Sequence, residues 1–179
     1  MSTRRLFGNW LGAAVRYLPI KHGLVSGPVT VRCDNASYRL SPDFYSFIVD
    51  AYFDGYVTDF RCGDGVELSF SDAFKLVINN DGAFIVVPGG IRLWADFIDY
   101  TVLSETWIYD IHFLGFDLSG WLILDVGAYI GDTALYYADK GAFVIAVEPV
   151  PRHFEALLRN IELNPSLKPR ILPINAAIG

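Results

Sequence analysis

The chain has 179 residues, of which 53% are hydrophobic and 19% are charged, so burial of apolar surface can offset the entropy of ordering and a disordered chain is excluded. The formal net charge of −6 provides no overall basic field for nucleic acid or an anionic membrane. Cys33 and Cys62 lack metal-ligand spacing, and we expect no metal site. One disulfide between them is an alternative, although a reducing, cytoplasmic setting is the simpler interpretation.

Residues 1–20 open with Arg4 and Arg5 and continue with an apolar stretch, as signal peptides do. Asn9 and Arg16 interrupt this stretch, which is shorter than the roughly 20 residues of a membrane span. We therefore expect no stable membrane span and predict an amphipathic first helix that packs on the domain. A helix lying in a membrane interface is the alternative.

The next segments alternate between strand and helix patterns. Residues 29–33 (VTVRC) predict a strand, followed by a turn. Ser41 is a candidate N-cap with Pro42 in the first helical position, and the helix should end at Gly55. Five residues at helical spacing predict its buried stripe: Phe44, Phe47, Ile48, Ala51 and Tyr52.

Residues 56–94 contain short β-type runs separated by Gly-rich breakers, which predict a small antiparallel module. It has no catalytic spacing of His, Cys or carboxylates, so we interpret it as a structural cap, with a substrate-facing wall as the alternative. Residues 96–114 appear mainly helical or irregular in pattern. Tyr109 and His112, just before the next strand, are weaker candidates for the wall of a site.

From residue 121 the pattern becomes β-α-β-α-β. The run WLILDV (121–126) predicts a strand buried on both faces of a parallel sheet, and FVIAV (143–147) predicts a second strand. Helices are expected at 133–140 and from Pro151 to Asn164. A third strand is expected at 170–176, where Pro173 favours an outer position in the sheet.

Polar and glycine residues gather where these strands end. Gly127 and Gly131 let a ligand approach the backbone after the first strand, and Asp125 precedes them by two positions. Glu148 ends the second strand, where such folds hydrogen-bond a ribose diol. The G-x-x-x-G spacing differs from the dinucleotide pattern G-x-G-x-x-G. A carboxylate at Asp125 suits an ammonium-bearing ligand better than a pyrophosphate, which favours S-adenosylmethionine over NAD.

The segment WLILDVGAYIGDTALYYADKGAFVIAVEPVPRHFEALLRNIELNP resembles the FkbM family of methyltransferases. The family pattern is a DVGA-x-IGDT strand-turn-helix, a strand ending in EP, and a helix with N-I-x-L-N. Family members commonly have Asn where this chain has Tyr129. The preceding ETWIYDIHFLGFDLSGW resembles the lead-in of archaeal members.

This resemblance implies an S-adenosylmethionine-dependent methyltransferase, usually one that O-methylates a small hydroxylated or sugar-like acceptor. It implies an α/β fold in which residues 118–179 form a partial Rossmann-like class I methyltransferase sheet (strands 3-2-1), preceded by a small α+β cap module at 1–117. It places the cofactor against ten residues: Asp125, Gly127, Ala128, Tyr129, Gly131, Asp132, Thr133, Glu148, Asn175 and Ala176. For Asp132 and Thr133, helix capping is an equal alternative.

The acceptor-binding half of such a sheet is missing from this sequence, so no catalytic residue can be assigned. The first strand should then present an apolar, unpaired edge. The cap module, a second copy of the chain or a further segment could cover it. The alternative to an enzyme is therefore a truncated, non-catalytic module that binds cofactor or protein.

Overall fold

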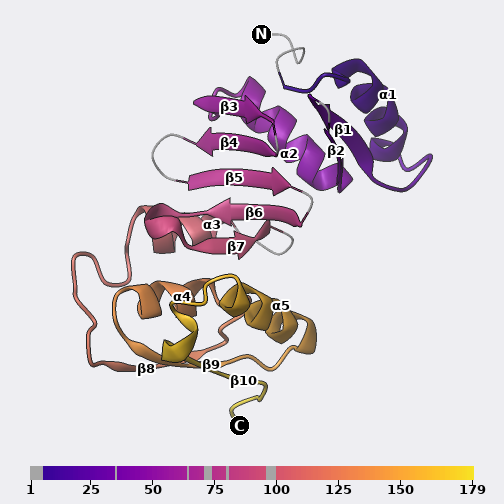
Figure 1. Ribbon diagram of the computed structural model, residues 1–179. Helices are drawn as coiled ribbons and strands as arrows, with labels where there is room; N and C mark the ends of the chain where they lie inside the picture. The colour runs from indigo at the N-terminus through magenta and orange to yellow at the C-terminus, as the bar shows by residue number, and fades with distance from the viewer. Residues whose placement is uncertain (1–5, 35, 64, 71–73, 80, 96–99) are drawn as a thin grey trace. The chain divides into compact units, whose positions relative to one another are not determined.

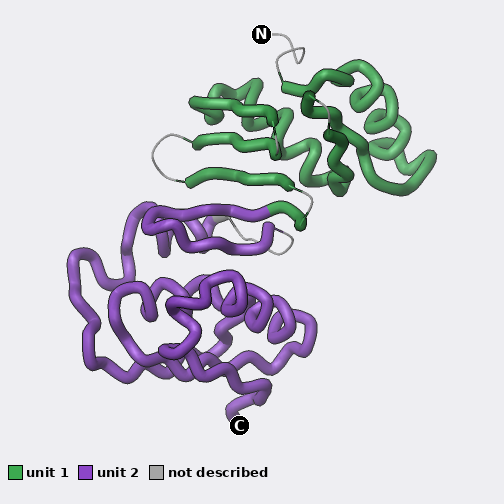
Figure 2. The backbone as a smooth tube through the Cα atoms, viewed as in Figure 1, with its two compact units in different colours: residues 1–83 green, residues 84–179 purple. Residues whose placement is uncertain are grey.

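The computed structural model describes the chain except for residues 1–5, 35, 64, 71–73, 80 and 96–99. It divides into two compact units, residues 1–83 and 84–179 (Figure 2). The predicted division lies elsewhere, at residue 117. Residues 84–117 belong to the unit that holds the parallel strands, because their backbone and side chains bind its helices, as described below.

The first unit begins with helix α1 (Trp10–Lys21) and a hairpin of β1 (Val29–Cys33) and β2 (Ala36–Leu40) (Figure 1). Helix α2 (Pro42–Phe53) follows, then the antiparallel strands β3 (Asp59–Cys62), β4 (Val66–Phe70) and β5 (Phe74–Asn79). Ser41 is the N-cap of α2, as predicted, because its hydroxyl accepts the Phe44 N–H at 3.2 Å. In the described part of the chain, every helix is too short or too polar to cross a bilayer.

The buried side of α2 differs from the predicted stripe. Tyr45, Ile48 and Ala51 are its buried residues, whereas Phe44, Phe47 and Tyr52 are only half-buried. Tyr45 packs against Phe7 and Tyr17, with its ring 5.2 Å from that of Tyr17. The prediction is thus confirmed at Ile48 and Ala51, and it missed Tyr45, whose partners Phe7 and Tyr17 lie outside α2.

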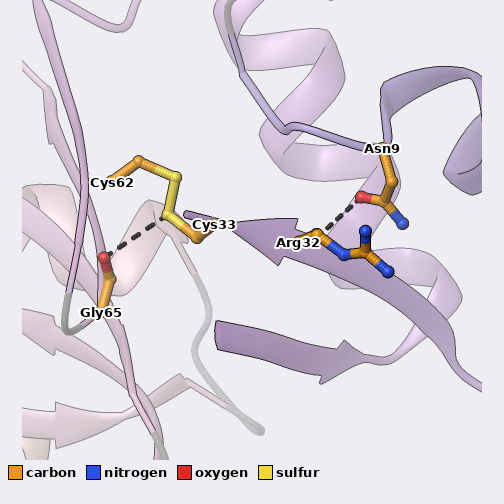
Figure 3. The surroundings of a disulfide bond; sticks show 5 residues. All are labelled: Asn9, Arg32, Cys33, Cys62 and Gly65. Atoms are coloured by element: carbon orange, nitrogen blue, oxygen red, sulfur yellow. Dashed lines mark hydrogen bonds between the residues drawn. A yellow bond between two sulfur atoms is a disulfide. The ribbon is translucent and has the colours of Figure 1, made fainter. Parts of the chain in front are cut away.

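A disulfide joins Cys33 at the end of β1 to Cys62 at the end of β3, with their Cα atoms 5.3 Å apart (Figure 3). The Cys33 sulfur also lies 3.7 Å from the carbonyl oxygen of Gly65. This is the alternative that the sequence left open. Disulfides are typical of oxidising compartments and of intracellular proteins from hyperthermophiles. The reducing, cytoplasmic setting therefore stays a prediction that the disulfide does not support.

We expect the disulfide to stabilise the first unit by about 3–4 kcal/mol, because it closes a loop with a sequence separation of 29 residues. Urea denaturation of the oxidised protein and of the Cys33→Ala/Cys62→Ala variant measures this difference. A reductant should destabilise the wild type and leave the double variant unchanged. Equal stability of the oxidised and reduced wild type would contradict the expectation.

The second unit begins within strand β6 (Gly82–Val86), which pairs antiparallel with β7 (Arg92–Trp94) across the short helix η2 (Pro88–Gly90). Helix α3 (Tyr100–Leu103) and the π-helical turn η4 (Ser104–Ile108) follow. Residues 96–99 of the predicted helical or irregular stretch lie outside the described residues.

The remaining elements of this unit are β8 (Leu122–Val126), α4 (Asp132–Asp139), β9 (Phe143–Val147), α5 (Pro151–Glu162), η5 (Lys168–Arg170) and β10 (Ile171–Ile174). The three strands are parallel in the order β10-β9-β8. This confirms the predicted 3-2-1 order and places Pro173 on an outer strand. Short parallel strands joined by helices give the mixed α/β, Rossmann-like arrangement expected for residues 118–179.

The expectation that the first strand is buried on both faces is wrong. Leu122, Leu124 and Val126 are 71%, 58% and 57% exposed. Alternate residues of a strand point to opposite faces, and helices α4 and α5 pack against the face that carries Ile123. A continuous apolar run therefore predicts a parallel strand, but it does not show that both faces are covered in this chain.

Two asparagines hold β7 to helix α5. Asn164 accepts the Arg92 N–H at 2.9 Å and donates to the Arg92 carbonyl at 2.7 Å. Asn160 accepts the Trp94 N–H at 2.8 Å and donates to the Ile130 carbonyl at 2.8 Å. These are the two Asn residues of the N-I-x-L-N segment. They pair backbone groups of β7 with side chains of the helix, which ties residues 92–94 to the parallel-sheet unit.

Candidate functional site

The loop between β8 and α4 folds over the carboxyl end of β9. The N–H groups of Gly127 and Ala128 both donate to the Val147 carbonyl, at 2.8 and 3.0 Å. The Tyr129 N–H donates to Glu148 Oε2 at 2.9 Å. Backbone bonds therefore hold the loop against the strand tip, and the groups predicted from the ends of the first two strands meet at one edge of the sheet.

Glycine is required at positions 127 and 131 of this loop for different structural reasons. Both have a positive φ, +78° at Gly127 and +83° at Gly131. A Cβ at Gly131 would lie 2.7 Å from Leu157 Cδ1, so this glycine allows α5 to pack against the start of α4. A Cβ at Gly127 would meet no atom within 4 Å. Only Gly127 thus offers the open backbone that a ligand could approach.

We expect Gly131→Ala to destabilise the second unit by about 2–3 kcal/mol, because it combines left-handed backbone strain with the Leu157 clash. Gly127→Ala carries the strain without the clash, and we expect a loss of about 1–2 kcal/mol. Chemical denaturation followed by tryptophan fluorescence compares the two variants. Equal losses, or a larger loss for Gly127→Ala, would contradict the packing role of Gly131.

Tyr129 also adopts a left-handed conformation, with φ +49°. Asn tolerates this region better than other non-Gly residues, so Tyr is an uncommon residue at such a position. The Tyr129 ring packs edge-on against His153, with the centroids 4.5 Å apart. The His153 side chain is 17% exposed and faces Tyr129 and Glu148.

Asp125 is the second-last residue of strand β8. One of its carboxylate oxygens accepts the Thr133 hydroxyl at 2.8 Å. Its other oxygen has no hydrogen-bond partner among the described residues. Burial raises the pKa of Asp125, and the Thr133 hydroxyl and nearby His112 offset part of this rise. The fold thus places a partly desolvated carboxylate, with one oxygen available, two residues before the open Gly127.

Asp132 and Thr133 lie in the first turn of helix α4. Gly131 is the N-cap residue and makes no side-chain capping bond. The Thr133 hydroxyl instead orients Asp125, and Asp132 is only 6% exposed. After burial, the charges of Asp125 and Asp132 also raise the pKa of Tyr137, so these three side chains are close neighbours. Gly131, and neither Asp132 nor Thr133, therefore occupies the N-cap position.

Glu148 lies at the tip of β9 and is 4% exposed. Its Oε2 accepts the Tyr129 N–H and its Oε1 accepts the Val150 N–H, at 2.9 and 2.8 Å. His153 Nδ1 lies 3.7 Å from Oε1. Glu148 thus links the loops that follow β8 and β9. Each carboxylate oxygen has a second lone pair, so the same group can still accept a ligand hydroxyl.

The remaining predicted residues lie at the same edge with different exposures. Asn175 donates its side-chain amide to the Glu148 carbonyl at 2.7 Å, and Ala176 is exposed beyond it. Ala128 is fully buried, so its contribution to a site is through the backbone. Within the described residues, no group of three or more His, Cys, Asp and Glu side chains could hold a metal ion.

Residues 104–117 contact helix α4, and the sequence singled out only Tyr109 and His112 among them. Asp110 accepts hydrogen bonds from the Tyr136 hydroxyl and, at 2.9 Å, from Lys140. Burial works against the charge of Asp110, but these two donors hold its pKa below the usual value. His112 contacts Tyr136 edge-on and lies near Asp125, whereas Tyr109 is 68% exposed. The sequence does not predict the contact of Asp110 with Tyr136 and Lys140, because no local pattern links an acidic loop residue to residues about 30 positions later.

The edge formed by these residues is the ligand-binding edge of an open parallel sheet, at the carboxyl ends of its strands. No family model matches the sequence, and no curated protein matches it. Among solved structures, Pyrococcus horikoshii TYW2 in complex with MeSAdo is 24% identical, with a TM-score of 0.39, over 91% of this chain and 63% of that chain. A P. horikoshii protein described as a transferase is 22% identical, with a TM-score of 0.40, over 92% and 62%.

A SAM-dependent methyltransferase from Agrobacterium tumefaciens is 14% identical, with a TM-score of 0.38, over 87% of this chain and 41% of that chain. This chain therefore spans about three-fifths of the length of the two P. horikoshii proteins. At these TM-scores the likenesses assign neither a fold nor an activity. What the site can bind must be argued from its own residues.

Proposed function

We propose that the second unit binds S-adenosylmethionine at the loop between β8 and α4, and that the protein is an S-adenosylmethionine-dependent methyltransferase related to the FkbM family. When bound, this cofactor supplies an electrophilic methyl group on a sulfonium. The observation that carries the proposal is Asp125, a partly buried carboxylate with one available oxygen beside the open backbone of Gly127. An ammonium group offers such an oxygen a charge-assisted hydrogen bond.

The neighbouring groups fit the other parts of the same molecule. In this proposal Asp125 and the backbone from Gly127 to Gly131 hold the methionine part, and Glu148 accepts a ribose hydroxyl. Asn175 and Ala176 flank the adenine. Thr133 orients Asp125 from the first turn of α4, and Asp132 adds a loop contact to the cofactor. A pyrophosphate would meet Asp125, Asp132 and Glu148 without a compensating cation among them, which disfavours a dinucleotide.

The methyl acceptor in this proposal is a small hydroxylated or sugar-like molecule. In-line methyl transfer requires mainly alignment of donor and acceptor, so a dedicated base is not required by the chemistry. The predicted cytoplasmic location stays a prediction, and the Cys33–Cys62 disulfide gives it no support.

Isothermal titration of the intact protein with S-adenosylmethionine, S-adenosylhomocysteine and NAD tests the proposal. We expect heat of binding with the first two ligands and none with NAD. The Glu148→Ala variant should bind S-adenosylmethionine more weakly by about 1–2 kcal/mol. Circular dichroism controls for folding, because Glu148 also accepts two backbone N–H groups. Absence of binding by the folded wild type would overturn the cofactor assignment.

A second candidate function is that of a module that binds the cofactor but does not catalyse methyl transfer by itself. The exposed apolar face of β8 favours this reading, because Leu122, Leu124 and Val126 would be covered if a second copy or another chain packed there. Sedimentation at increasing concentration detects self-association. Ligand binding without methyl transfer to hydroxylated acceptors would favour the module, whereas transfer would favour the enzyme.

A further inference from the structure

Helix α1 has two apolar sides. One side packs on the first unit, where Ala13 is 1% exposed and Tyr17 donates its hydroxyl to Ser46 of α2 at 2.9 Å. The other side carries Leu11, Val15 and Leu18, which are 58%, 61% and 53% exposed. These three residues follow i, i+4, i+7 spacing, so they form one stripe along the helix. Figure 1 shows α1 beside the β1–β2 hairpin.

The orientation of this stripe is fixed by polar anchors on the packed side. Asn9, just before the helix, donates to the Thr30 carbonyl at 2.9 Å and accepts the Arg32 N–H at 2.7 Å (Figure 3). The Tyr17–Ser46 bond holds the middle of the helix. Rotation of α1 to bury Leu11, Val15 and Leu18 within the unit would break these bonds. The helix therefore presents its second apolar side as a consequence of how it is anchored.

The charged residues of helix α1 itself, Arg16 and Lys21, are both basic. Residues 1–33 contain five Lys and Arg residues and no Asp or Glu, whereas all 20 acidic residues of the chain follow them. Arg16 and Lys21 are exposed on the helix itself. Arg16 also donates to the Ser26 carbonyl at 3.0 Å, which positions the loop after the helix. In that loop Leu24 and Val25 are 76% and 42% exposed.

An exposed apolar stripe on a helix whose charged residues are all basic is a feature of helices that lie in a membrane interface. A second copy of the chain would bring the same positive charges together, which disfavours self-association through this face. An anionic lipid surface attracts them and accepts the apolar side chains. We propose that α1 docks the protein on anionic phospholipid membranes through Leu11, Val15 and Leu18, with Arg16 and Lys21 toward the head groups.

Vesicle co-sedimentation of the full chain tests this. Phosphatidylcholine vesicles that contain phosphatidylserine should bind the protein, vesicles of phosphatidylcholine alone should bind it weakly, and added salt should reduce binding. The Leu11→Gln/Val15→Gln/Leu18→Gln variant should lose binding by about tenfold or more. Since these side chains are exposed, the variant should keep the thermal stability of the wild type. Phe53→Gln/Tyr56→Gln removes exposed apolar residues elsewhere on the first unit and should bind normally.

Charge is tested separately. Lys21→Gln should weaken binding about fivefold, the effect of one basic residue near an anionic surface. Lys168→Gln removes one exposed positive charge from the second unit and should have little effect. The proposal is overturned if the wild type does not co-sediment with phosphatidylserine-containing vesicles at low salt. It is also overturned if analytical ultracentrifugation finds a dimer that the triple variant dissolves, because the stripe is then a protein interface.

Discussion

The Asp125→Asn variant should bind S-adenosylmethionine about 10- to 150-fold more weakly than the wild type, while its unliganded form becomes more stable at neutral pH. The loss of affinity is that of one hydrogen bond to a charged group. The gain in stability follows from burial, which raises the pKa of Asp125. Isothermal titration and thermal unfolding of the same preparations measure the two effects.

The direction of the stability change can be derived from proton linkage. A carboxyl whose pKa is raised by folding binds its proton more tightly in the folded state than in the unfolded chain. It favours folding below its ordinary pKa, and this advantage is lost as pH rises through the raised pKa. At neutral pH the buried charge of Asp125 therefore costs stability, and Asn removes the charge while its side-chain oxygen can still accept the Thr133 hydroxyl.

Asp139, at the other end of α4, provides the matched control. Burial also raises its pKa, so Asp139→Asn should likewise stabilise the protein at neutral pH. Because Asp139 lies away from the Gly127 loop, this variant should keep its affinity for S-adenosylmethionine. Asp125→Asn with wild-type affinity would show that the carboxylate does not contact the ligand. Such a result would leave the fold as described and remove the main support for the cofactor assignment.

The Asn160→Ala variant should lose about 3–5 kcal/mol of stability in the second unit. Asn160 is fully buried, and its removal leaves the Trp94 N–H and the Ile130 carbonyl without partners. Each buried polar group left unpaired costs about 1–3 kcal/mol. Urea denaturation followed by tryptophan fluorescence measures the change, and β7 should lose protection in amide hydrogen exchange.

Glu155→Ala is the control on the same helix, because Glu155 is exposed and has no such role. It should change stability by less than about 0.5 kcal/mol. A small effect of Asn160→Ala, similar to that of Glu155→Ala, would mean that β7 is held by other contacts. The cation–π contact of Arg159 with Trp94, at 4.3 Å, is the first of these to examine.

Several parts of the fold could be predicted because their determinants are local. Ser41-Pro42 defined the start of α2, and apolar runs bounded by glycines defined β8 and β9. The order β10-β9-β8 was expected from the resemblance to class I methyltransferases, because the alternation of strand and helix patterns alone predicts parallel strands and not their order. Asp125, Gly127 and Glu148 could be named in advance because parallel strands bring their carboxyl ends to one edge.

The sequence by itself determined which residues form strands and helices and which polar groups lie at the strand tips, since these depend on periodicity, capping and turn chemistry within short segments. Only the tertiary structure decided what those groups contact. In the folded chain, Gly131 allows α5 to pack against α4, whereas the backbone at Gly127 is open. His153 lies beside Glu148, and one face of β8 is exposed. Such outcomes depend on side chains far apart in the chain, whose meeting no local pattern encodes.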